Sequence, residues 1–324
     1  MPQDVTLKEY AEHAWNNSRF LDANVTANFA DNAPLLDVLP FRNIGLGKLT
    51  YDFIRESALP DAAYRGVNES YTPSFGEVKP LQESVKLLGA ILRTDTAIAG
   101  YEQQEAVSAQ GFLSNQALMH IRSLALKVQK TFLKGDSSTN PKEVDGLQSR
   151  IGNGSSQLIT PGTTNSGDAL SIGNLVEGVL NTRKPTHIVM SLKMFIRYQQ
   201  FVNDNNNSIV RSTYDEFGNF VENFNGIPIL IMDEDGEGNQ ILPFTESNPN
   251  ASATATGSTS IYVISASPGH LYGIQQEPMR TREIGEDPNS PHLISKIDWN
   301  HGLVLQDARS VTRIAGIADA AITT

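Results

Sequence analysis

The chain has 324 residues, no cysteine and a formal net charge of -11 at pH 7. The absence of cysteine excludes disulfides, thiolate metal sites and a cysteine nucleophile. The acidic balance, with no strongly basic window, argues against tight binding to phosphate backbones, which requires clustered Lys and Arg. No apolar stretch approaches the length of a membrane span and no signal peptide is visible, so we expect a cytoplasmic protein with two domains or one large divided domain.

Residues 1–42 are predicted to form an N-terminal arm. Thr6 and Glu9 have the spacing of a capping box, and Leu7 and Tyr10 begin a short amphipathic face. The polar stretch from Asn24 to Pro34 cannot bury much surface by itself. We therefore expect the arm either to be mobile or to lie on another surface.

Residues 43–92 are predicted to form a long hairpin. Leu49, Tyr51 and Phe53 alternate with polar residues, which is strand periodicity, and a second extended run follows from Phe75 to Leu92. The polar tip between the two arms, from Glu56 to Ser74, contains no lysine. A two-stranded ribbon is at best marginally stable in water, so a long one is expected to dock on a neighbouring surface.

A long helix is predicted from Asp95 to Leu133, about forty residues or roughly 60 Å at the helical rise. Asp95 is expected to cap its first turn, and Lys134 and Gly135 to end it. Its core-facing stripe recurs at steps of three and four residues: Leu113, Ala117, Ile121, Leu124, Val128 and Phe132. A helix of this length indicates an elongated subunit.

The remainder of the chain is predicted to form a loop, a compact lobe and a set of closing strands. Residues 135–168 are rich in small and polar residues and are typical of a boundary between domains. In the α/β lobe that follows, Asp168 and Ser191 are each expected to cap a helix, residues 246–259 to form an exposed loop, and three runs to form strands: Thr186–Ser191, Gly226–Met232 and Ile261–Ile264. Four C-terminal strands are expected to pair with one another and to pack against the long helix: Met279–Ile284, Leu293–Trp299, Leu303–Gln306 and Val311–Ile317.

The sequence contains no complete catalytic or ligand-binding motif. Gly47-Lys48 resembles the end of a P-loop, but Arg42 stands where the first glycine belongs. Asp233 to Gly238 resembles the first half of a calcium loop, but Phe244 occupies the position of the bidentate acid. A solvated acidic turn is the better interpretation there, and an adventitious cation site is the weaker one.

The six histidines lack metal-ligand spacing, so structural roles are the default for each of them. Trp299 and His301 are interpreted as core residues of a terminal strand rather than as a pocket. We therefore predict no catalytic residues, no cofactor-binding residues, no metal-binding residues and no cofactor.

The order of these segments resembles the major capsid proteins of tailed bacteriophages, which have the Hong Kong 97-type fold. Four stretches carry the resemblance: Phe132 to Asp136 with Pro141, Gly146 and Leu147; Pro185 to Phe195; Asn225 to Ile229; and Trp299 to Ile317. It implies an α+β fold with an N-terminal arm (1–42), an extended β-hairpin loop (43–92), a peripheral domain with the spine helix at about 95–134 (93–167), an axial domain (168–275) and return strands of the peripheral domain (276–324).

This resemblance implies a non-enzymatic protein that self-assembles into hexamers and pentamers, which form the icosahedral head shell around phage DNA. It implies location in the virion capsid after assembly in the host cytoplasm. Only about forty residues precede the hairpin, so a separate scaffold protein is expected, together with a portal; a decoration protein is a further candidate partner. Neither sequence-specific nucleic-acid binding nor membrane association is expected.

Some members of this family cross-link a hairpin lysine to an asparagine of a neighbouring subunit. Because the predicted tip has no lysine, and only Lys48 and Lys79 lie near it, we expect no covalent cross-link. Two alternatives stay open: an encapsulin-type nanocompartment shell with the same fold, and a soluble hydrolase whose site is formed by residues distant in sequence.

Overall fold

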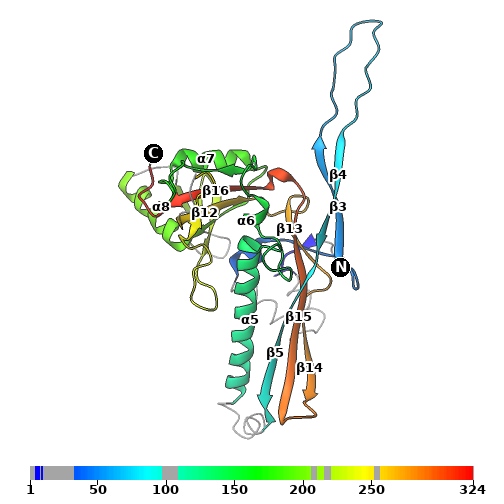
Figure 1. Ribbon diagram of the computed structural model, residues 1–324, viewed down its shortest axis with the longest axis vertical. Helices are drawn as coiled ribbons and strands as arrows, with labels where there is room; N and C mark the ends of the chain where they lie inside the picture. Colours follow the sequence, from blue (N-terminus) through cyan, green and yellow to red (C-terminus); the bar gives the residue numbers. More distant parts are fainter. Residues whose placement is uncertain are drawn as a thin grey trace.

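The computed structural model describes residues 4–7, 9, 33–96, 109–205, 210–214, 220–251 and 256–323. These residues form a six-stranded sheet, an eight-stranded sheet and a separate two-stranded sheet. Figure 1 shows an elongated molecule. The two-stranded sheet projects from one end, a long helix runs beside long strands toward the other end, and the eight-stranded lobe lies to one side.

The long helix is α5 (Ala109–Lys134), which has 26 residues and a length of about 39 Å. Its predicted stripe is confirmed where side chains are described, because Ile121, Leu124, Val128 and Phe132 are all buried. The helix ends at Lys134 as expected. A Cβ on the next residue, Gly135, would lie 2.2 Å from the Val144 carbonyl oxygen, so only glycine permits the following loop to pack this closely.

The predicted helix start at Asp95 agrees with the structure, in which the next residue, Thr96, is helical. Asp95 is the last residue of strand β5 (Lys86–Asp95) and lies opposite His292, the first residue of β15 (His292–Leu305). Ten consecutive residue pairs join these two strands, so the strand pairing ends at the residue before the helix begins. Residues 97–108 lie outside the described part of the chain.

The six-stranded sheet runs in the order β1 (Asp4–Val5), β2 (Phe41–Asn43), β13 (Leu271–Gln275), β15 and β14 (Arg280–Glu286), and β5 also pairs with β15. The two predicted strands at Leu293–Trp299 and Leu303–Gln306 are the single long strand β15. Its lower half lies between β5 and β14, and its upper half pairs with β13. The expectation that the C-terminal strands pair with one another is thus confirmed for β14 and β15.

The same expectation is wrong for the last strand, β16 (Val311–Ala318). It pairs with β12 (Thr256–Ile264) and β6 (Leu158–Ile159) in the eight-stranded sheet. Every residue from Val311 to Ile317 is buried, and a strand buried on both faces belongs in the centre of a sheet that is covered on both sides.

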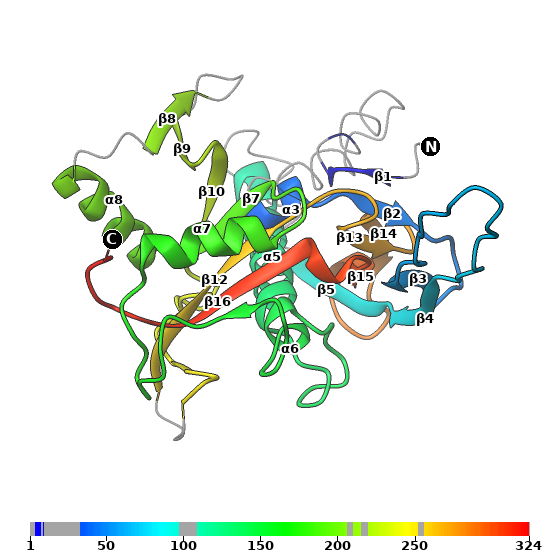
Figure 2. The same cartoon turned by 90° about the horizontal axis from the view of Figure 1, so that it is seen from above.

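The rest of the eight-stranded sheet follows the predicted lobe. After β12 come β7 (His187–Ser191), β10 (Ile227–Met232), β9 (Phe220–Phe224) and β8 (Val210–Tyr214), while β11 (Glu246–Ser247) pairs with the far end of β12. Helices α7 (Ile172–Asn181) and α8 (Leu192–Asn205) pack against this sheet. In Figure 2, α5 is seen end-on between this lobe and the strands of the six-stranded sheet.

The two helix caps predicted in the lobe have different outcomes. Ser191 caps α8, since its Oγ accepts a hydrogen bond from the Met194 amide at 3.3 Å. Asp168 does not cap α7; Ser171 does, accepting from the Asn174 amide at 3.1 Å. Asp168 instead accepts hydrogen bonds from the amide and hydroxyl of Thr164, so its carboxylate is used by the preceding turn.

Two stretches that were predicted to be loops contain short regular elements. The boundary segment 135–168 includes α6 (Leu147–Arg150) and β6, and the 246–259 segment includes β11 and the start of β12. In the arm, the capping box is confirmed: the Thr6 amide donates to the Glu9 carboxylate at 2.8 Å, and the Glu9 amide donates to Thr6 Oγ1 at 3.3 Å. Two further short elements are the helix α3 (Pro34–Val38) and the single turn η1 (Ala308–Ser310).

Trp299 and His301 lie in the core, as expected. Phe41, Phe132 and Trp299 form an aromatic cluster, with the Phe41 and Trp299 ring centroids 5.3 Å apart. The His301 ring stacks on Trp299 at 4.6 Å and lies tilted against Phe132 at 5.5 Å. An imidazole held between two aromatic rings away from water is stabilised in its neutral form.

Lowering the pH is expected to destabilise the fold through His301. Burial lowers the pKa of His301 to about 4, whereas the ordinary value is 6.5. Between these values the unfolded chain binds the additional proton, so the stability is fully present above pH 6.5 and is lost as the pH falls toward 4. The expected loss is about 3 kcal/mol. Urea unfolding of His301→Phe at neutral pH and at pH 4 should show a correspondingly smaller pH dependence.

The matched control for this prediction is Trp299→Phe. It disturbs the same aromatic cluster but retains the titrating ring, so it should lower stability by a similar amount at both pH values. A His301→Phe protein that loses as much stability on acidification as the parent chain would contradict the assignment.

Candidate functional site

The most unusual feature of the molecule is a hairpin that stands apart from both main sheets. It consists of β3 (Thr50–Ala58) and β4 (Glu77–Ser84), which pair only with each other among the described strands. The run predicted as one strand from Phe75 to Leu92 is two strands, because the chain passes the buried Val85 and continues as β5 beside β15. The projecting part of the predicted 43–92 hairpin is therefore shorter than the sequence pattern suggested.

Large apolar side chains on the hairpin are left exposed by the rest of the described chain. The exposed set is Ile54, Leu59, Tyr64, Val67, Tyr71, Phe75 and Val78. Val67, near the end of the tip, is 93% exposed. Four carboxylates between residues 56 and 77 outnumber the single cation Arg65. Such a concentration of exposed apolar groups with polar neighbours marks an interaction surface.

The tip is held in one conformation by its own contacts. The Glu69 carboxylate accepts a hydrogen bond from the Gly66 amide at 2.7 Å, and the Glu69 carbonyl accepts one from Arg65 at 3.1 Å. The Arg65 guanidinium also lies over the Tyr71 ring, 5.1 Å from its centroid. Asn68 adopts a φ of 68°, which lets the chain reverse at the tip. A preordered tip loses less entropy when it binds a partner.

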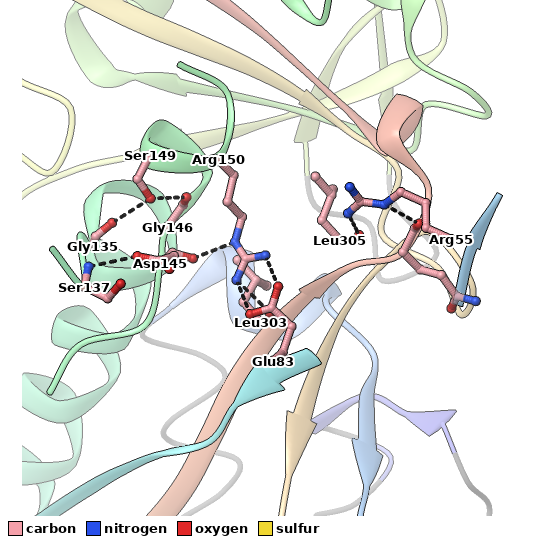
Figure 3. A network of polar contacts seen from close by, with 11 residues as sticks. Arg55, Glu83, Gly135, Ser137, Asp145, Gly146, Ser149, Arg150, Leu303 and Leu305 are labelled. Carbon is pink, nitrogen blue, oxygen red and sulfur yellow. Dashed lines mark hydrogen bonds and ion pairs between the residues drawn. The ribbon is translucent and has the colours of Figure 1, made fainter. Parts of the chain in front are cut away.

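The base of the hairpin is tied to the body by two arginines, shown in Figure 3. Arg150 of α6 makes a bidentate ion pair with Glu83 of β4, donates to the Leu303 carbonyl at 3.1 Å and donates from Nε to the Asp145 carbonyl at 2.8 Å. Arg55 of β3 donates to the Leu305 carbonyl and, at 3.0 Å, to the Gln306 carbonyl. Burial, and then the nearby Arg150 cation, lower the pKa of Arg55. Each hairpin strand is thus attached to the end of β15 by one charged group.

A small hydrophobic cluster also packs the base of the hairpin against the six-stranded sheet. Phe53 of β3 and the junction residue Val85 are buried with three residues of the six-stranded sheet: Tyr272, Ile274 and Val304. The Tyr51 and Tyr272 rings meet edge to face at a centroid distance of 6.4 Å. The base of the hairpin is therefore packed, while its outer part is free.

A groove of about 490 Å³ runs along the opposite part of the molecule, on the face of the three-stranded ribbon formed by β5, β15 and β14. Its apolar lining includes Leu46, Leu87 and Ile91, all of them exposed. Two lining cations already have partners, since Arg280 pairs with Glu277 and Lys296 pairs with Asp298, each at 3.0 Å. Arg282 is the lining cation that has no acidic partner among the described residues. The groove thus combines an apolar floor with an unbalanced positive charge.

Comparisons with known proteins agree with this architecture. Residues 22–178 match the family model of the major capsid protein GP7. The holo-SrpI encapsulin from Synechococcus elongatus PCC 7942 superposes with a TM-score of 0.63 at 12% identity, over 90% of this chain and 89% of that chain. The capsid of an empty GTA particle gives 0.61 at 13% identity, over 89% and 90%. A structure from Mycobacterium phage Bobi gives 0.52 at 13% identity, over 85% and 87%. No curated protein matches the chain.

At this level of identity the solved structures establish the shared fold, and the family match spans the segment from the arm through the hairpin and α5 to α7. The chain has the Hong Kong 97-type capsid fold, and its residues 22–178 resemble a major capsid protein. The long helix α5 is accordingly the spine helix of this fold, and the β3–β4 hairpin is its extended loop. Shell formation is the role that the family match and the capsid neighbours support.

The carboxylate of the acidic turn after β10 is hydrogen-bonded by other residues of the chain. Asp235 accepts hydrogen bonds from the amides of Glu237 and Asn239, and Lys130 of the spine helix donates to it at 2.6 Å. Although burial opposes it, these donors together lower the pKa of Asp235. In the part of the chain that the structure describes, no three His, Asp or Glu side chains are placed to hold a metal ion, and no helix is long and apolar enough to cross a membrane.

Two features of the candidate site were missed by reasoning from sequence. The Arg150–Glu83 contact joins residues 67 positions apart, and neither residue belongs to a motif. The groove is assembled from β5, β14 and β15, so it exists only after long-range pairing. The alternation of Leu87, Gly89 and Ile91 was the only available signal, since it places three small or apolar residues on one face of a strand.

Proposed function

We propose that this chain is a major capsid protein that self-assembles into hexamers and pentamers, which form the icosahedral head shell enclosing phage DNA. The observation that carries the proposal is the projecting hairpin, whose ordered apolar tip finds no partner within the described chain. A closed shell supplies every subunit with a neighbour, so the same surface patch is covered on all copies. The protein is structural and non-enzymatic in this proposal.

We propose that the segments of the chain form the following domains of the capsid subunit. Residues 1–42 serve as the N-terminal arm, 43–92 as the hairpin loop with its continuation into β5, 93–167 as the peripheral domain with the spine helix, and 168–275 as the axial domain. Residues 276–324 return to the peripheral domain through β14 and β15 and end in the axial sheet through β16.

The hairpin of one subunit is proposed to lie on the ribbon groove of a neighbouring subunit. Its exposed Leu59, Val67 and Phe75 match the apolar floor of the groove, and its excess of carboxylates matches Arg282, which has no acidic partner among the described residues. Both surfaces are present on every copy, so the contact repeats around a ring.

Other components complete the proposed assembly. A separate scaffold protein and a portal act during construction in the host cytoplasm, and a decoration protein is a candidate for the outer surface. The virion capsid is the final location. The chain carries a net charge of -11, which suits a container wall that holds DNA without sequence-specific binding.

Negative-stain microscopy of the expressed chain, with and without a candidate scaffold protein, tests this proposal. Closed particles of uniform size are expected under at least one of these conditions. A subunit that stays a soluble monomer in both, with its hairpin folded onto its own body, would contradict the proposed function.

Particles are expected to contain no covalent link between subunits. The hairpin tip has no lysine, and the exposed Lys79 of β4 lies below it, so a lysine–asparagine bond of the family type has no donor at the tip. Boiled, denatured particles should therefore run as one band at the subunit mass on an SDS gel. A ladder of multiples of that mass would contradict this prediction.

An encapsulin-type nanocompartment is the second candidate, favoured by the likeness to the Synechococcus elongatus encapsulin. Both functions use the same shell, so the contents decide between them. Particles purified from the native source should contain double-stranded DNA if the head-shell proposal is correct. A defined protein cargo without DNA would favour the nanocompartment.

A further inference from the structure

The hairpin leaves the body at a point where strand pairing stops. The chain runs as one extended segment from Glu77 to Asp95, but β4 pairs with β3 and β5 pairs with β15. Between them, Val85 donates its amide to the Leu49 carbonyl and closes the hairpin. Beyond His301, the edge of β15 that β5 has left has no backbone hydrogen-bond partner on that side among the described residues.

Arginine side chains occupy this edge in place of a strand. The carbonyl oxygens of Leu303, Leu305 and Gln306 accept hydrogen bonds from Arg150 or Arg55. A backbone ladder would fix the hairpin through many bonds along its length, whereas side-chain contacts fix it at a few points near its base. The direction of the hairpin is therefore determined locally, by the residues at this junction.

Arg150 is the contact that best defines this direction. Its planar guanidinium donates to both carboxylate oxygens of Glu83. It also donates to the Leu303 carbonyl of β15 and to the Asp145 carbonyl in the loop after the spine helix. A bidentate arginine–carboxylate pair constrains orientation as well as distance. The hydrophobic packing of Phe53 and Val85 at the base of the hairpin is non-directional, so it constrains the hairpin angle less than this pair does.

The geometry of the hairpin amplifies any change at this junction. Sixteen residues separate Glu83 from Val67, which corresponds to up to about 53 Å of extended chain. A rotation of about ten degrees at the base would therefore displace the tip by roughly 9 Å. A displacement of that size is larger than the spacing of neighbouring strands, so it would change which part of a partner surface the tip meets.

We propose that Arg150 is a positioning residue that sets the angle at which the hairpin leaves the body, and thereby the angle between neighbouring subunits of the shell. The second half of this statement rests on the proposed function. Because the pair is only partly buried and fully hydrogen-bonded, its contribution is to direction more than to stability.

Distance measurements between two spin labels test the first half. The chain has no cysteine, so Val67→Cys at the tip and Leu180→Cys on α7, both at exposed positions, allow site-specific labelling. In dissociated subunits diluted with unlabelled chain, the parent protein should give one narrow distance distribution. Glu83→Gln and Arg150→Lys, which each break the bidentate pair, should widen or shift it by several ångströms.

The matched control is Asp52→Asn. Its carboxylate accepts a hydrogen bond from Gln82 at 2.9 Å across the hairpin itself, so this variant weakens the hairpin without touching the junction. It should leave the distance distribution unchanged. If Glu83→Gln also leaves the distribution unchanged, the positioning role of Arg150 is refuted, whatever the protein assembles into.

Particle diameters test the second half. Glu83→Gln should give shells with a broader or shifted range of diameters in electron micrographs, while Asp52→Asn shells keep the parent diameter. Parent shells and Glu83→Gln shells of identical diameter would overturn the link to subunit angle. A parent chain that forms no shells at all would instead refute the proposed function, and the spin-label distances would still decide the role of Arg150.

Discussion

Replacing Arg313 with methionine is expected to lower the free energy of unfolding by about 3–5 kcal/mol. Arg313 of β16 is buried and donates to Ser260 Oγ at 3.0 Å, to the Ile151 carbonyl at 3.1 Å and to Glu246 Oε2 at 3.1 Å. Lys134, at the end of the spine helix, contacts the other carboxylate oxygen of Glu246 at 2.9 Å. Removing the arginine leaves a buried carboxylate with half of its charge partners and buried carbonyl oxygens without donors.

This network joins the two main parts of the subunit, because Lys134 belongs to the spine helix whereas Glu246, Ser260 and Arg313 belong to the eight-stranded sheet. Loss of this network should therefore weaken the attachment of the eight-stranded lobe to the spine helix and also lower the stability of the lobe. Urea unfolding of the dissociated subunit, extrapolated to water, measures the change.

Arg183→Met is the matched control for this prediction. Arg183 also pairs with a carboxylate, that of Asp307 at 2.9 Å, but about half of its side chain is exposed. Solvent-exposed pairs of this kind contribute about 0–1 kcal/mol, so the control should change stability little. If Arg313→Met were no more destabilising than Arg183→Met, the buried network would not hold the lobe to the helix.

Local periodicity was sufficient to predict the elements whose faces are set by neighbouring residues in the chain. The stripe from Ile121 to Phe132 recurs with the helical period, and burying it needs only a partner surface of any kind. The capping box of Thr6 and Glu9 and the Ser191 cap involve residues three positions apart, so the sequence contains all of the required information.

Long-range pairing explains the predictions that were wrong. The run from Phe75 to Leu92 looked like one strand, but β4 pairs with β3 whereas β5 pairs with β15, almost two hundred residues away. Val311 to Ile317 has the composition of a central strand of either sheet, and only pairing with β12 and β6 assigns it to the lobe. The Arg150–Glu83 and Arg313–Glu246 contacts are similarly invisible in sequence, because each joins a surface-type residue to a distant partner.

Removing the hairpin tip is expected to abolish assembly while leaving the subunit folded. The five large apolar residues between Leu59 and Phe75 are exposed, and the hydrogen bonds described for the tip are internal to it, so the dissociated subunit should lose no stability in urea unfolding. Burying one such side chain on a partner contributes about 1.5–3 kcal/mol, which amounts to roughly 7–15 kcal/mol for each hairpin. An interface deprived of that contribution falls below what association costs.

Two smaller changes separate loss of docking from loss of fold. Tyr64→Ser, at the tip, and Arg282→Glu, in the groove, alter one exposed side chain each, on the two surfaces proposed to meet. Both should reduce the yield of particles in electron micrographs and sedimentation, because one removes buried apolar area and the other sets like charges against each other. Ser57→Ala with Ser70→Ala changes the same hairpin without removing apolar surface, and should assemble normally. Normal shells from the chain that lacks its tip would show that the hairpin does not hold neighbouring subunits together.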